Sequence, residues 1–121
     1  MIDHLEICVA DLAESARFFE GALSPLGYRR HVDANPTGFG VDPVAPDFWI
    51  RAGGPSRPLP HVAFHCETRA LVHQCHEAAL RAGGRNQRAP ALMPQVHAAY
   101  FSGQVLDPDG HNIEFACHRA E

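Results

Sequence analysis

The chain has 121 residues, of which 45% are hydrophobic, and its formal net charge is −4. This length accommodates one ordinary domain or two very small modules with a shared sheet system, because half of the chain alone would bury little apolar surface. The ten basic residues are all arginines and are scattered, which argues against a nucleic-acid-binding surface. Without a run of eighteen apolar residues or a signal-like amino terminus, we expect a cytoplasmic protein with no membrane contact.

The first predicted element is a strand near the amino terminus, followed by a helix. Alternation with period two places Leu5, Ile7 and Val9 on one face of the strand, and His4, Glu6 and Cys8 on the other. Asp11 with Glu14 three residues later resembles a capping box, and Gly27 marks the expected end of the helix. This helix is therefore predicted to cover the apolar face of the strand.

Short strands follow the first helix. The predicted strands span residues 28–33, 38–41 and 48–51, and proline-containing turns separate them. Residues 53–60 are rich in glycine and proline, so they are predicted to be a linker. Residues 1–52 thus form a first βαβββ module.

The second half of the chain repeats the first, 57 residues later. His61 stands where His4 stands, Gly84 stands where Gly27 stands, and no gap is needed between these anchors. The repeated strand again places its histidine on the less apolar face, and Thr68 is the expected cap of the second helix. Two copies of one unit would place two imidazoles in symmetric positions, where a metal or a substrate could be held.

After the second helix, the pattern predicts strands at residues 85–89, 98–106 and 112–118. A loop with Pro90 and Pro94 follows the first of them, and Asp107-Pro108-Asp109-Gly110 predicts a tight turn between the other two. The second module is therefore residues 61–121. We predict one α+β domain over residues 1–121, built from two βαβββ modules with helices on the outer faces.

The four cysteines do not predict disulfides or a zinc site. They are far apart and form no Cys-x-x-Cys pair. Cys66, Cys75 and Cys117 fall on predicted buried faces, where a free cysteine behaves as a small hydrophobic residue. Cys8 differs because it shares the face of His4.

A carboxylate in the last strand is the strongest chemical signal. Glu114 lies between Ile113 and Phe115, and alternation places it on the face that carries His4 and His61 in their own strands. Burying a carboxylate is costly without a partner. A divalent ion shared with two imidazoles would satisfy it, and two histidines with one carboxylate suit Fe, Mn, Zn or Ni.

The order of these motifs resembles the vicinal oxygen chelate superfamily, which includes glyoxalase I, extradiol dioxygenases, fosfomycin-resistance enzymes and bleomycin-resistance proteins. The resemblance covers nearly the whole chain. It rests on residues 2–12 with Ser15 and Phe18-Phe19, on Pro25-Leu26-Gly27-Tyr28, on residues 60–64, and on residues 106–114. It implies paired modules whose curled mixed sheets enclose a cavity, with metal ligands in the first and last strands of each module.

By position, the resemblance implies that His4, His61 and Glu114 are three of these ligands. The fourth position aligns with Trp49, which cannot coordinate a metal. We therefore expect a three-ligand site of the dioxygenase or fosfomycin-enzyme kind, and not the four-ligand site of glyoxalase I.

Several side chains are candidate helpers at this site. His97 and Glu6 are candidate proton shuttles, and Tyr100 is a candidate hydrogen-bond donor. Arg51 is a candidate clamp for an anionic substrate, while Trp49 and Cys8 are candidate substrate contacts. The loop at residues 88–96 is expected to cover the mouth of the cavity.

Two functions of different classes remain open at this point. The first is a divalent-metal-dependent lyase, isomerase, transferase or dioxygenase that acts on a small substrate with neighbouring oxygens. The second is a metal-free protein of the bleomycin-resistance kind, which sequesters a ligand without chemistry. In either case the resemblance implies a homodimer, because short family members commonly dimerise, and the modules can pair within one chain or between two chains.

Overall fold

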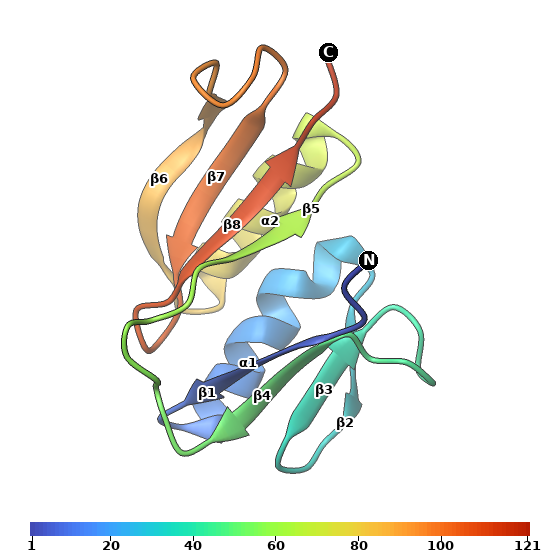
Figure 1. Cartoon of the computed structure of the whole chain (residues 1–121), viewed down its shortest axis with the longest axis vertical. Helices are drawn as coiled ribbons and strands as arrows, with labels where there is room; N and C mark the ends of the chain where they lie inside the picture. The colour runs from blue at the N-terminus through green and yellow to red at the C-terminus, as the bar shows by residue number, and fades with distance from the viewer.

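A computed structural model describes all residues, 1–121, and contains two four-stranded mixed sheets, each with one long helix (Figure 1). The first module contains β1 (Leu5–Val9), α1 (Leu12–Leu23), the short 3₁₀ helix η1 (Ser24–Leu26), β2 (Arg29–Val32), β3 (Thr37–Gly40) and β4 (Phe48–Ala52). The second contains β5 (Val62–His65), α2 (Arg69–Arg81), β6 (Arg85–Leu92), β7 (Phe101–Leu106) and β8 (Asn112–Cys117). The predicted α+β class and the two βαβββ modules are confirmed.

The two sheets have the same topology. Their strand orders are β1-β4-β3-β2 and β5-β8-β7-β6, so the first and last strands of each module pair in parallel and the other pairs are antiparallel. Neither sheet closes into a barrel, and β1 and β5 are edge strands. Both helices lie on the same side of the sheets, behind the strands in the view of Figure 1. His4 and His61 stand directly before β1 and β5.

The helix ends follow local chemistry. The Asp11 carboxylate accepts a hydrogen bond from the Glu14 N–H, and the Thr68 hydroxyl accepts one from the Leu71 N–H, as the sequence predicts for two caps. After η1 the chain turns at Gly27, whose φ of 82° lies in the left-handed region that favours glycine. None of the helices has the length and apolarity needed to cross a bilayer.

One hydrophobic core joins the two modules. Alternate residues are buried in β1, β4 and β5, and the apolar faces meet around a chain of phenylalanine rings. Phe48 of β4 packs edge to face on Phe19 of α1, with centroids 4.9 Å apart, and on Phe64 of β5, with centroids 5.3 Å apart. Cys66, Cys75 and Cys117 are fully buried and all four cysteines are free, as predicted.

The structure corrects two strand boundaries. β6 runs from Arg85 to Leu92, through Pro90, although the sequence predicts a loop there. Proline is tolerated because β6 is an edge strand and its pairing with β7 is irregular between Arg88 and Ala91. β7 begins at Phe101, since the residues just before it form a turn. The first part of the predicted covering loop is therefore strand.

Candidate active site

The buried carboxylate of Glu114 is the centre of a hydrogen-bonded cluster on the second sheet. Its side chain is only 8% exposed. The Tyr100 hydroxyl donates to Oε2 over 2.5 Å, and the Gln104 amide donates to Oε1 over 3.2 Å. His61 Nε2 lies 3.0 Å from the same Oε1. The sequence prediction that Glu114 and His61 share a face therefore corresponds to a direct contact.

The cluster keeps Glu114 ionised although it is buried. Burial is the largest single influence and raises the pKa of Glu114. Hydrogen bonds from Tyr100, Ser102 and Gln104, together with the charge on His61, lower it by more, so that the pKa lies below its ordinary value. Glu114 is therefore a carboxylate at neutral pH, which is the form that a metal or a cationic group binds.

Tyr100 acts as a donor and not as a base. Burial, followed by its hydrogen bond to the Glu114 carboxylate, raises the pKa of Tyr100 to about 12. A tyrosine with this pKa keeps its proton at neutral pH. Its hydroxyl faces Glu114, so it positions the carboxylate, which is a more specific role than the general donor that the sequence predicts.

We expect this raised pKa to be visible in an ultraviolet titration of Tyr28→Phe protein, in which Tyr100 is the remaining tyrosine. Phenolate absorbance should appear near pH 12, and not near the ordinary value of 10.0. A raised pKa means that folding stabilises the protonated form. The contribution of Tyr100 to the free energy of unfolding should therefore be fully present below pH 10 and should be lost as the pH rises toward 12.

A matched variant separates the causes. Glu114→Gln removes the negative charge, so the phenolate should appear at lower pH in the double variant. An unchanged titration curve would mean that Tyr100 does not donate to Glu114 in solution.

His4 lies apart from this cluster. Its Nδ1 is 2.6 Å from the Asp3 carboxylate, and its side chain is 57% exposed. It lines a cleft of about 280 Å³ where the beginning of β1 meets β5 near His65. His4, His61 and Glu114 of one chain do not bring their ligand atoms within 4.8 Å of one another. One chain thus brings two of the three predicted ligands together.

The equivalent face of the first sheet carries different chemistry. The register pairs Glu6 with Trp49 and Ala63 with Glu114, so Trp49 occupies the position of Glu114, as the sequence alignment of the modules predicts. The Trp49 indole N–H donates to the Pro46 carbonyl, and its ring covers Gly38, where a Cβ atom would lie 2.7 Å from the ring. This face offers no carboxylate at the Glu114 position.

The remaining predicted helpers of the first module contact one another. The Arg51 guanidinium donates to both carboxylate oxygens of Glu6, over 3.0 and 3.3 Å. This pair neutralises its own charges, so neither side chain is a free clamp or base in this arrangement. Cys8 is partly exposed, and its Cβ lies close to the backbone of Gly54.

His97 is next to the cluster but does not touch Glu114. Its Nε2 lies 2.9 Å from Nδ1 of His118, and its ring packs on Tyr100 with centroids 5.5 Å apart. The structure therefore connects His97 to Glu114 through Tyr100.

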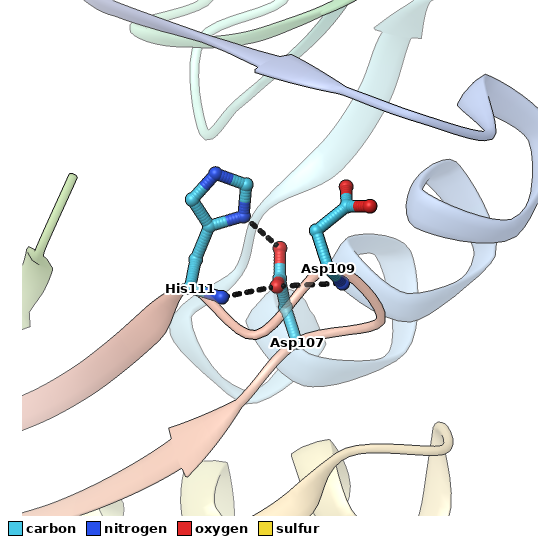
Figure 2. Close-up of side chains that lie close together, drawn as sticks. All are labelled: Asp107, Asp109 and His111. Carbon is cyan, nitrogen blue, oxygen red and sulfur yellow. Dashed lines mark hydrogen bonds and ion pairs between the residues drawn. The ribbon is translucent and has the colours of Figure 1, made fainter. Parts of the chain in front are cut away.

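A second cluster of possible metal ligands lies in the connection from β7 to β8, where the sequence predicts only a tight turn (Figure 2). Asp107, Asp109 and His111 each offer a ligand atom within 4.8 Å of the others, a spacing compatible with a divalent ion. The side chains of Asp107 and His111 are completely buried. The signal that could have found this cluster is a histidine four residues after the first aspartate of the turn.

The carboxylate oxygens of this turn already accept hydrogen bonds. Asp107 Oδ1 accepts hydrogen bonds from the N–H groups of Asp109 and His111, and Oδ2 lies 2.7 Å from His111 Nδ1. The Asp109 carboxylate points away from the other two side chains in Figure 2 and accepts from the Ala10 N–H over 3.1 Å. His111 Nε2 has no partner, which fits a neutral ring protonated on Nδ1. We interpret the cluster as a lock that holds the turn and ties it to the first module.

Comparison with known proteins agrees with this architecture. Among proteins of curated function, none matches the sequence. A crystal structure of a glyoxalase/bleomycin resistance protein from Albidiferax ferrireducens T118 is similar, with a TM-score of 0.80 at 20% identity over 97% of this chain and 98% of that one. A glyoxalase/bleomycin resistance protein/dioxygenase family enzyme from Burkholderia phytofirmans PsJN has a TM-score of 0.74 at 14% identity, over 98% of both chains. At these identities the likeness establishes the fold.

The family follows from the sequence itself. The model of the Glyoxalase/Bleomycin resistance protein/Dioxygenase superfamily matches residues 1–115, which include the first module, most of the second and the Glu114 cluster. The repeated module and the parallel pairing of first and last strands fit that match. The chain therefore belongs to the glyoxalase/bleomycin resistance protein/dioxygenase superfamily.

Proposed function

We propose that the protein is a divalent-metal-dependent enzyme that acts on a small substrate with neighbouring oxygen atoms. The observation that carries this proposal is the pair of a buried, ionised Glu114 and a half-exposed His61 whose Nε2 faces it at 3.0 Å. Imidazole and carboxylate are common ligands of Zn, Fe, Mn and Ni. Two of the three proposed donors thus fit such an ion, and His4 is the third.

The third ligand leads to a proposed homodimer. His4 and His61 both lie on exposed faces, and one chain keeps His4 away from the pair. In a symmetric dimer, His4 of one copy would meet His61 and Glu114 of the other. The proposed site is therefore shared between two chains.

The chain's own residues would prepare this site. Tyr100 and Gln104 hold the Glu114 carboxylate in one orientation, which fixes the direction of its free lone pairs. Ala63 and Ala116 flank Glu114 on the paired strands, so short side chains leave space beside it. A bound divalent ion would supply Lewis acidity to the substrate's oxygens, in a lyase, isomerase, transferase or dioxygenase reaction.

A metal-free ligand-binding protein is the second candidate. The observation that favours it is that Glu114 is satisfied by Tyr100, Gln104 and His61 without an ion. Trp49 in the equivalent position of the first module gives an aromatic surface to a ligand and no ligand atom to a metal. Metal binding separates the two functions.

We expect protein purified without chelator to bind one divalent ion per chain at the His61–Glu114 site, with the occupancy measured by elemental analysis and calorimetry. His61→Ala should weaken binding by more than about 100-fold, since losing even an outer partner of a ligand costs about 10–100-fold. His73→Ala, on the exposed side of α2, is the control and should change nothing. If the wild type binds no ion that His61→Ala removes, and none can be restored, the metal-free function is the correct one.

Mixing two defective variants tests the shared site. A heterodimer of His4→Ala and His61→Ala chains has one intact site, so a random mixture should regain about a quarter of the wild-type sites. If the site lay within one chain, the mixture would regain no metal sites.

A further inference from the structure

Three histidines from different segments meet at the end of the second sheet. His97 lies in the turn before β7, His118 directly follows β8, and His65 is the last residue of β5. All three side chains are exposed. None of them belongs to the proposed site of His4, His61 and Glu114.

His97 and His118 face each other through ring nitrogens. His97 Nε2 is 2.9 Å from His118 Nδ1, and the rings are close to one plane, with an angle of 19° and centroids 5.2 Å apart. The Ala99 N–H donates to His97 Nδ1 over 3.2 Å, so this nitrogen is an acceptor and carries no proton. Neutral His97 is therefore protonated on Nε2 and donates to His118 Nδ1.

His65 places a third imidazole beside His118. Their rings are nearly parallel, at 16°, with centroids 6.1 Å apart. His65 Nε2 also lies 3.3 Å from a Glu67 carboxylate oxygen. The ligand atoms of the three imidazoles do not all lie within 4.8 Å of one another, so His97 and His118 are the pair that can share an ion.

We propose that His97 and His118 form a second transition-metal site, completed by water and suited to Zn and to other ions that prefer imidazole. Metal–nitrogen bonds of about 2.0–2.1 Å at a tetrahedral angle place two nitrogens about 3.3 Å apart. His97 and His118 come within a few tenths of an ångström of that spacing, and exposed rings can tilt to reach it. This site is independent of the proposed function.

Binding requires a change of tautomer at His97. The metal takes the lone pair of Nε2, so the proton that Nε2 now carries must move, through water, to Nδ1. The Ala99 N–H then loses its acceptor. Metal binding is thus coupled to the turn before β7, and the ion replaces the hydrogen bond between the two rings.

The site would also affect Tyr100. The Tyr100 ring packs edge to face on both imidazoles, with centroids 5.5 Å from His97 and 5.1 Å from His118. The hydroxyl of the same residue donates to Glu114. An ion that fixes the two imidazoles would therefore also restrain the side chain that orients Glu114.

The test uses Zn in calorimetry with full-length protein carrying His4→Ala and His61→Ala, which removes the other proposed site. We expect one Zn per chain, and at least tenfold weaker binding when His97→Ala or His118→Ala is added. His73→Ala is the matched control and should bind like the background. No saturable binding, or equal binding in all variants, would overturn the proposal, whatever the fate of the proposed function.

Nitrogen-15 spectra of the histidine rings supply a second readout. Without metal, His97 should carry its proton on Nε2, and saturating Zn should move it to Nδ1 and shift the Ala99 amide. His97→Gln, with unfolding monitored in parallel, separates loss of the ligand from loss of the fold. A His97 tautomer that is unchanged at saturation contradicts the assignment.

Discussion

Replacing Phe48 with alanine is expected to lower the free energy of unfolding by about 3–5 kcal/mol. The Phe48 ring is 2% exposed and contacts rings from both modules, Phe19 and Phe39 in the first and Phe64 in the second. No strand of one sheet pairs with a strand of the other, so this apolar contact is central to the association of the two sheets. Urea denaturation followed by Trp49 fluorescence and circular dichroism measures the change.

The two probes should report one transition, because both modules share one core. Val41→Ala is the control, since Val41 is 62% exposed and its truncation should change stability by no more than about 0.5 kcal/mol. Separate transitions for fluorescence and circular dichroism would mean that the modules are stable without each other.

The second large effect is expected at Asp107. Asp107→Ala removes a buried carboxylate that accepts three hydrogen bonds, and it leaves the buried His111 ring without its partner. Removing one member of a buried charged or hydrogen-bonded pair costs about 3–5 kcal/mol. Asp109→Ala is the matched control, and it should cost about 1 kcal/mol because it loses one hydrogen bond, to Ala10.

Thermal unfolding with and without chelator then separates a turn lock from a metal site. We expect the chelator to change the melting temperature of the wild type and of Asp107→Ala protein by the same amount, because the stabilisation by Asp107 does not depend on an ion. A chelator-induced loss of stability that is absent from Asp107→Ala protein would instead assign an ion to Asp107, Asp109 and His111.

The sequence predicted the elements well where a pattern repeats. Alternation in the strands and the 57-residue repeat depend on short-range periodicity, so they gave the two modules and the faces of His61 and Glu114. Pro90 was misleading because an edge strand tolerates a residue without an N–H, and nothing local marks a strand as an edge.

The sequence predicted the site only as far as the two faces of each strand determine where a side chain lies. Alternation states which side of a strand carries His4, but it does not state how two sheets are placed, so the separation of His4 from Glu114 was not visible. The contact of Tyr100 with Glu114 depends on the antiparallel register of β7 and β8. The pairing of Glu6 with Arg51 depends likewise on β1 lying beside β4.

Trp49 gives the protein an internal optical reporter. It is the single tryptophan of the chain, it is partly exposed, and its indole N–H has one partner, the Pro46 carbonyl. Its emission therefore comes from one defined place, the first-module counterpart of the Glu114 position. Compounds that settle against this face would quench or shift that emission, so a collection of small oxygenated molecules can be screened without a label and before any reaction is known.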